Sequence, residues 1–236
     1  MQELRSVTIQ RNFTAQTPGS VLYRCGKTVL LCTASLEKKV PDWMAGRGKG
    51  WITAEYNMLP GSTSPRKARE RSGKVDGRTT EIQRLIGRSF RAVADLDKLG
   101  ERSLTIDCDV LQADGGTRTA AITGGFIALI DAVNSVFRGV PEDQYPIRGS
   151  VAAVSVGIVD GIPTLDLDYA RDVRADVDMN VVMTGGGKFI EIQGTGEEAT
   201  FDDDELAALL KLAKQGISQL STIQRDSLGT DWPWQK

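Results

Sequence analysis

The stretch from Leu104 to Val133 constrains the fold more than any other part of the sequence. An alternating run ends at the turn Asp114-Gly115-Gly116, and an apolar run with helical spacing begins at Thr117. This order predicts a strand, a glycine turn and a helix. The first N–H groups of a helix lack partners within it and carry partial positive charge. The stretch therefore predicts a phosphate-binding turn, to which Arg118 would add a bidentate fork.

The segments on either side of this stretch add further strands and helices. Residues 4–36 and 151–193 have the patterns of strands separated by turns, whereas residues 77–96 and 202–217 have helical spacing. Strands covered by helices, without regular alternation of the two, predict an α+β fold. We expect a single domain over residues 1–236, in which mixed β-sheets pack with α-helices and a weak internal duplication is present.

The absence of histidine excludes several classes of enzyme. Neither a Ser-His-Asp or Cys-His mechanism nor a zinc site that needs imidazole is available to a chain with no histidine. Cys25, Cys32 and Cys108 lie in strand-like runs, which predicts buried free thiols and a reducing cytoplasm. No apolar run approaches the length of a membrane span and the first residues have no signal-peptide core, so no membrane partner is expected.

A dense group of basic residues lies between Arg66 and Arg91 in a chain of net charge -2. The second part of this region predicts an amphipathic helix, with Arg84, Arg88 and Arg91 opposite an apolar stripe. A solvated basic face is one interpretation of that pattern. The preference for arginine over lysine favours recognition of phosphate groups instead. Arg78 lies at the predicted helix start, where it would serve an anion.

The residues from 165 to 178 are rich in aspartate. The set consists of Asp166, Asp168, Asp172, Asp176 and Asp178. Closely spaced carboxylates repel each other, so a cation or arginines must compensate them unless they lie in polar turns and strand edges. One alternative is that Asp172 and Asp178 converge on a divalent metal. Oxygen-only ligation in a chain without histidine points to Mg²⁺ or Mn²⁺.

Gly26-Lys27-Thr28 resembles the end of a P-loop, the phosphate-binding loop of many nucleotide-binding enzymes. The first glycine of that motif would fall at position 21, which is Val21, and a strand rather than a helix follows. We therefore expect a hairpin turn at this position.

Four longer motifs place these features in one context. They are GRTTEIQRLIGRSFRA, DGGTRTAAITGG, LDLDYARD followed by DVDMNVVMT, and FIEIQGTGEEATF. In this order they resemble the ribonuclease PH family of phosphate-dependent 3′-exoribonucleases, which trim tRNA precursors. The resemblance runs over roughly residues 4–224.

The resemblance implies the RNase PH-like fold, also known as ribosomal protein S5 domain 2-like, with duplicated βαβ-type halves. It implies that Arg78 and Gly116, Thr117 and Arg118 bind inorganic phosphate, the co-substrate. Asp172 and Asp178 would be catalytic and would bind Mg²⁺ or Mn²⁺. Phosphate would attack the last linkage of an RNA, especially a tRNA precursor 3′ end, and release a nucleoside diphosphate. The reverse reaction adds nucleotides.

The resemblance also implies a homohexamer built as a trimer of dimers. Five arginines would either follow the RNA backbone or line a subunit interface, and the sequence leaves both roles open. They are Arg66, Arg69, Arg71, Arg84 and Arg88. An alternative function is that of a non-catalytic RNA-binding ring subunit of the exosome type. Because such subunits lose the phosphate-binding arginines or the acidic residues and this chain keeps both, we expect an active enzyme.

Overall fold

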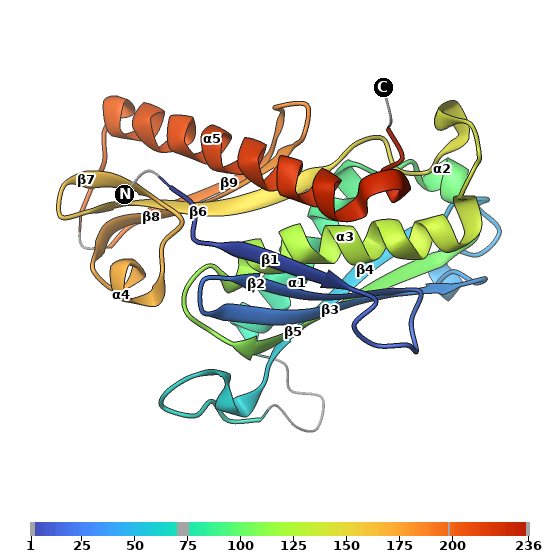
Figure 1. Ribbon diagram of the computed structural model, residues 1–236, viewed down its shortest axis with the longest axis horizontal. Helices are drawn as coiled ribbons and strands as arrows, with labels where there is room; N and C mark the ends of the chain where they lie inside the picture. Colours follow the sequence, from blue (N-terminus) through green and yellow to red (C-terminus); the bar gives the residue numbers. More distant parts are fainter. Residues whose placement is uncertain (1–2, 70–75, 198, 235–236) are drawn as a thin grey trace.

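The computed structural model describes residues 3–69, 76–197 and 199–234, which form two β-sheets with helices against them (Figure 1). The first sheet has the order β1-β2-β3-β5-β4 and the second the order β7-β6-β8-β9. The strands of the first sheet are β1 (Val7–Arg11), β2 (Gly19–Cys25), β3 (Thr28–Glu37), β4 (Trp51–Met58) and β5 (Ser103–Gln112). Those of the second sheet are β6 (Val151–Val159), β7 (Ile162–Leu165), β8 (Ala175–Thr184) and β9 (Phe189–Gly196). The expected α+β fold is confirmed.

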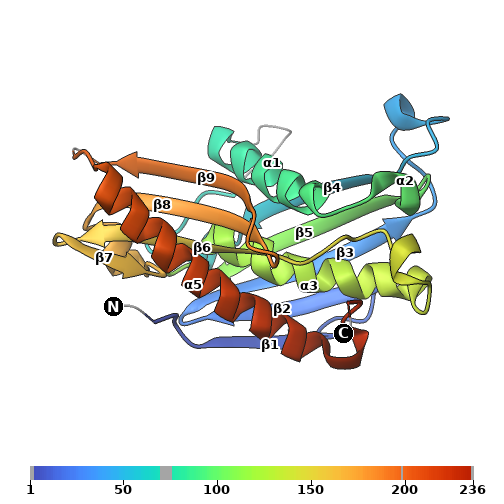
Figure 2. The same cartoon turned by 90° about the horizontal axis from the view of Figure 1, so that it is seen from above.

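Two long helices and one of intermediate length carry most of the helical packing. The helices are α1 (Gly77–Ala92), α2 (Leu96–Leu99), α3 (Thr117–Phe137), α4 (Tyr169–Asp172) and α5 (Asp203–Leu228). Short 3₁₀ turns occur at Asp42–Met44, Pro60–Ser62, Glu142–Gln144 and Gly229–Asp231. Helix α1 packs on β4, and α5 covers β6 and β7 (Figure 2).

Helix α3 packs against strands of both sheets, since it contacts β2 and β3 of the first and β6 of the second. It therefore has almost no polar face, and every residue from Thr119 to Asn134 is buried. Contrary to the expectation from the sequence, α3 is long and apolar enough to cross a bilayer, but 72% of its apolar window is buried inside the protein. Its apolar character is accounted for by its position in the core.

The two halves differ in how their strands are connected. In the first half, β4 and β5 are parallel, and the segment that joins them contains α1. The pairings of the second sheet are antiparallel, and short turns join β6 to β7, at Asp160-Gly161, and β8 to β9. Parallel strands need a long crossover, whereas antiparallel strands need only a hairpin. Both halves thus contain a sheet covered by helices, as the expected duplication requires. The parallel βαβ unit occurs only in the first half, among the described residues.

The predicted amphipathic helix is confirmed as α1, with one correction. Ile82, Leu85, Ile86 and Phe90 are buried, while Arg84 and Arg88 are exposed. Arg91 is not on the solvated face. Its guanidinium lies over the Trp51 ring and donates to the backbone oxygen of Ile52 at 2.7 Å. A long arginine stem can lie along apolar surface in this way.

The three cysteines are buried and free, as predicted. Cys32 and Cys108 face each other directly across β3 and β5. The segment Gly26-Lys27-Thr28 is also confirmed as part of a hairpin, because β2 and β3 pair from Cys25 and Thr28 onward. The P-loop interpretation is thereby excluded.

Candidate active site

The turn before α3 has the features of an anion site. Gly115 and Gly116 have φ of 75° and 66°, in the left-handed region that favours glycine. Gly116 is the N-cap residue of α3, and no side chain caps this helix. By contrast, Asp76, Asp168 and Asp202 accept hydrogen bonds at the starts of α1, α4 and α5. The start of α3 therefore keeps its N–H groups available for an anion.

Gly115 also brings the turn close to the acidic segment. A Cβ at this position would lie 2.4 Å from the backbone oxygen of Leu167 and 2.8 Å from the backbone nitrogen of Tyr169. Tyr169 is the first residue of α4, the short helix that contains Asp172. From the sequence, the glycines were expected only to form a turn at which an anion can approach the backbone. The structure adds that Gly115 allows two segments far apart in sequence to touch.

The starts of α1 and α3 converge beside β4. The Tyr56 hydroxyl of β4 donates to Thr117 Oγ1 at 2.9 Å. Burial raises the pKa of Tyr56, while the hydrogen bond to Thr117 and the positive charges of Arg78 and Arg118 oppose that rise. Both arginines thus lie near one side chain. Arg78 is exposed, in the first turn of α1.

Arg118 is held by groups from α1 and β9. Its Nη1 donates to Gln193 Oε1 at 2.8 Å and lies 3.5 Å from Glu81 Oε1. Gln193 Nε2 in turn donates to Glu81 Oε1 at 3.2 Å. A guanidinium has five N–H donors, so these contacts orient the group and leave donors for a phosphate.

Asp172 and Asp178 lie near these arginines. Burial raises the pKa of Asp172, and the negative charge of Asp178 raises it further. The positive charges of Arg78 and Arg118 lower the same pKa, and Glu197 raises it. The structure thereby brings the predicted arginines of α1 and α3 together with the predicted carboxylates of α4 and β8.

The two carboxylates fit a hydrated divalent cation better than a closed protein cage. Within residues 3–69, 76–197 and 199–234, no group of three or more His, Cys, Asp or Glu side chains is placed to hold a metal ion. Mg²⁺ is commonly bound by one or two carboxylates together with waters and substrate phosphates. Asp172 lies on the surface beside the like charge of Asp178, and a cation would relieve that repulsion.

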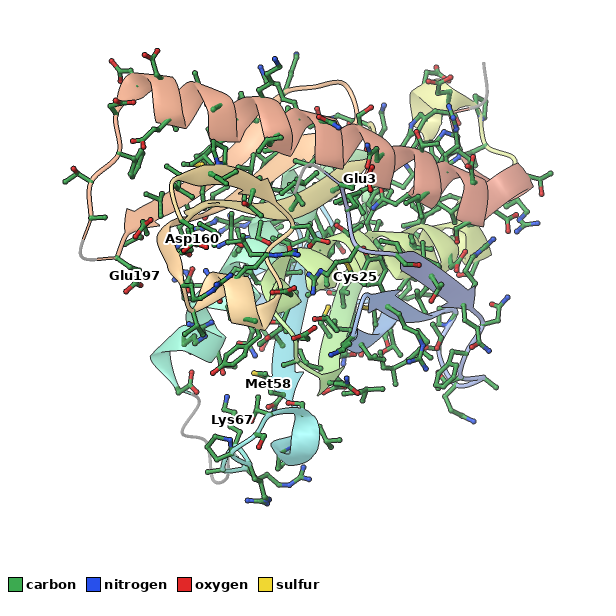
Figure 3. All side chains as sticks on the ribbon, turned by 60° about the vertical axis from the view of Figure 1, so that its left-hand side comes forward. Glu3, Cys25, Met58, Lys67, Asp160 and Glu197 are labelled. Atoms are coloured by element: carbon green, nitrogen blue, oxygen red, sulfur yellow. The ribbon has the colours of Figure 1, made fainter. Side chains whose placement is uncertain are left out.

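The structure describes four of the five remaining predicted arginines. Arg66 and Arg69 are exposed on the segment after β4, which carries Lys67 and extends away from the sheets (Figure 3). Arg71 lies outside the described residues. Arg84 is exposed, and Arg88 pairs with Glu191 of β9 at 2.8 Å. Their roles in RNA binding or subunit contact stay predictions.

Three residues of the site were not predicted from the sequence: Tyr56, Glu81 and Gln193. Glu81 follows Arg78 by three residues on α1, so helical spacing alone placed the two on one face. Nothing local identified Tyr56 or Gln193. Their positions depend on strands β4 and β9 meeting the starts of α1 and α3.

Comparisons with known proteins identify the family of this chain. Models of the 3′ exoribonuclease family match residues 3–134 for domain 1 and 149–216 for domain 2. A curated Ribonuclease PH from Rhodopirellula baltica is 64% identical, covering 97% of this chain and 95% of the relative. One from Listeria monocytogenes is 54% identical, covering 96% and 92%.

Solved structures share the fold at much lower identity. Rrp46 from rice has a TM-score of 0.77 at 17% identity and covers 96% of each chain. The Archaeoglobus fulgidus exosome with RNA bound to the active site also has a TM-score of 0.77, at 19% identity, covering 94% of this chain and 89% of that one.

Family matches over most of the chain, on a fold that places an open helix start near two carboxylates, define a 3′ exoribonuclease. The curated relatives narrow that class further. The chain belongs to the ribonuclease PH family, and the enzyme class expected from its motifs is confirmed. The prediction of a single domain stays a prediction.

Proposed function

We propose that the protein shortens tRNA precursors from their 3′ ends by phosphorolysis and releases nucleoside diphosphates. The observation that carries the proposal is the uncapped start of α3, flanked by Arg78 and Arg118 and placed near Asp172 and Asp178. This arrangement serves a reaction in which one anion attacks another. The same site would run the reverse reaction, the addition of nucleotides.

Inorganic phosphate would bind at Gly116, Thr117 and Arg118, with Arg78 completing the site. The backbone N–H groups and two guanidinium groups would offset the charge of phosphate as it approaches the RNA linkage. Glu81 and Gln193 hold the Arg118 guanidinium in place before phosphate arrives. Such orientation lowers the barrier because the nucleophile is already aligned with the scissile phosphorus.

Asp172 and Asp178 would hold Mg²⁺ or Mn²⁺ on the opposite side of the reacting groups. The ion would supply charge stabilisation for the transferring phosphoryl group and the leaving 3′ oxygen. Without the ion, the two carboxylates would repel the RNA phosphate. Their placement near Arg78 and Arg118 keeps the nucleophile and the metal ligands in one site.

The exposed arginines Arg66, Arg69 and Arg84 would contact RNA or a neighbouring subunit. The assembly is a homohexamer, a trimer of dimers, in a cytoplasmic setting that suits buried free thiols. The alternative of a non-catalytic ring subunit receives no support from the site, because the arginines and the carboxylates are both present and lie together.

A single assay tests the proposed function. A tRNA precursor is incubated with and without inorganic phosphate, and the released nucleotides are identified. Nucleoside diphosphates should appear only when phosphate is present, because phosphate is the nucleophile. Release of monophosphates without phosphate would identify water as the nucleophile and contradict the proposal.

A further inference from the structure

A buried ion pair lies behind the phosphate turn, between Arg5 and Asp166. Arg5 precedes β1 in the first half, and Asp166 follows β7 in the second. Arg5 Nη2 lies 2.7 Å from Asp166 Oδ1, and Arg5 Nε donates to Oδ2 at 3.0 Å. The Arg5 backbone N–H also donates to Oδ2, at 2.9 Å. The side chains are 13% and 5% exposed, so the pair is held in one geometry.

The same guanidinium holds the phosphate turn. Arg5 Nη1 donates to the backbone oxygen of Asp114 at 2.6 Å, and Nη2 donates to that of Gly115 at 3.5 Å. Thr28 supports the turn from β3. Its hydroxyl donates to the Gly115 oxygen at 2.7 Å and accepts from the Asp114 N–H at 3.0 Å. The two carbonyl groups that precede the open start of α3 are therefore fixed.

Asp166 is fixed at the beginning of the acidic segment. Its φ is 55°, and its N–H donates to the backbone oxygen of Ser155 at 2.8 Å. The next N–H, of Leu167, donates to Ser155 Oγ at 3.0 Å. Two residues after Asp166, Asp168 caps α4, the helix that carries Asp172. Movement of Asp166 would therefore be transmitted to Asp172 through a short, hydrogen-bonded segment.

We propose that Arg5 is a positioning residue, a strut that sets the phosphate turn at a fixed distance from the segment that carries Asp172. Its guanidinium contacts both sides at once, because it donates to the Asp166 carboxylate and to the backbone oxygen of Asp114. The contact of Gly115 with Leu167 prevents the two segments from moving closer. The strut prevents them from separating.

The pair is ionised and persistent. Burial opposes the ionisation of Asp166, but hydrogen bonds and the positive charge of Arg5 outweigh it and hold the Asp166 pKa below its usual value. The Cys25 thiol, whose residue is labelled in Figure 3, donates to Asp166 Oδ2 at 3.4 Å. Burial, reinforced by the Asp166 charge, raises the pKa of Cys25 to about 12, so the thiol stays neutral beside the pair.

The role of Arg5 rests on the proposed phosphorolysis, and it predicts different effects on the kinetics for phosphate and for RNA. A turn that moves relative to Asp172 would bind phosphate less well and align it poorly, and a misplacement of about 1 Å can cost about 100-fold in rate. The affinity for RNA depends on other surfaces. Loss of the strut should therefore raise the KM for phosphate and lower kcat, with little change in the KM for RNA.

Arg5→Lys and Arg11→Lys form a matched pair for the test. Arg11 lies at the other end of β1, where it donates to Asp131 and Asp231 and is 20% exposed. Lysine keeps the charge at either position but cannot form the fork. Phosphate affinity is measured by calorimetric titration with inorganic phosphate, and both KM values by the release of diphosphates.

For Arg5→Lys we expect phosphate affinity to fall about tenfold or more, by the same alignment argument, while the KM for RNA stays near the wild-type value. Arg11→Lys should lower the melting temperature but leave phosphate affinity unchanged. If both variants keep wild-type phosphate affinity, Arg5 is a structural residue only and the strut is overturned. If the wild-type protein itself fails to bind phosphate, the proposed function falls with it.

Thr28→Val and Thr28→Ser provide a second test in case Arg5→Lys does not fold. Valine keeps the shape of the buried Thr28 and removes its two hydrogen bonds to the turn, whereas serine keeps the hydroxyl. Thr28→Val should weaken phosphate binding and Thr28→Ser should restore it. Equal phosphate affinity in the two variants would show that fixing the turn does not matter for the site.

Discussion

Arg118 shows how the immediate neighbours of a side chain prepare it for one ligand. Glu81 balances its charge, and Gln193 fixes one edge of the guanidinium. Arg118 is 15% exposed, so the group is partly withdrawn from water and interacts more strongly with a bound anion. A phosphate that enters the site meets an oriented donor set. This arrangement makes Arg118 the most informative residue for mutation.

Replacement of Arg118 by alanine should abolish phosphate-dependent release of diphosphates while leaving RNA binding largely intact. A hydrogen bond to a charged group contributes about 1.5–3 kcal/mol, which corresponds to a loss of affinity of at least tenfold. The measurement is the rate at low and high phosphate concentration. Arg225→Ala, which removes an exposed arginine of α5, is the control. Unchanged activity of Arg118→Ala at low phosphate would contradict the assignment.

Asp178→Asn should remove activity together with the response to Mg²⁺. An amide is a weaker ligand for a hard cation than a carboxylate. Loss of the Asp178 carboxylate therefore leaves Asp172 as the one remaining carboxylate ligand of the pair. Activity is measured against Mg²⁺ concentration and in the presence of a chelator. Asp176→Asn, on the same strand but not among the charges that shift Asp172, should behave as wild type. A wild-type enzyme that is fully active in chelator would refute the metal role.

At the scale of elements, local sequence patterns were enough to predict those helices and strands that depend only on their own residues. The periodicity of α1 predicted its apolar stripe, and helical spacing predicted a helix where α5 begins. The Arg5–Asp166 pair joins positions 161 residues apart, so no local signal revealed it. The sequence identified Gly115 only as a glycine in a turn. Its contact with Leu167 depends on the second half being folded.

Asp166→Asn should destabilise the protein more at neutral pH than in acid. Removing one partner of a buried pair costs about 3 kcal/mol or more. Because the folded-state pKa of Asp166 is lowered, its contribution is fully present above the unfolded pKa of about 3.9 and fades as pH falls toward the folded value. Urea unfolding at pH 7 and near pH 3, at one protein concentration, measures the difference. Equal losses at both pH values would contradict this sign.

At the scale of the whole molecule, the site depends on how the two sheets share α3. The phosphate side comes from α1 and α3, and the acidic side from α4 and β8. Side-chain contacts tie β9 to the first half, among them Arg88 with Glu191, Arg118 with Gln193 and Gln193 with Glu81. A site divided in this way forms only when both halves are packed. The sequence motifs identified each side separately, and the packing of α3 determines their distance.

Variants of Arg66 and Arg69 test whether the protein uses these residues to contact RNA or another subunit. Replacing both with alanine should reduce the slope of log affinity against log salt by about 1.4 if each contacts one phosphate of single-stranded RNA. If they line a subunit interface instead, the mass from light scattering should fall. Lys211→Ala with Arg225→Ala removes the same charge from exposed positions of α5 and should change neither quantity. A double variant of Arg66 and Arg69 that matches this control in both measurements would make them ordinary surface residues, since a contact of either kind must alter one of the two.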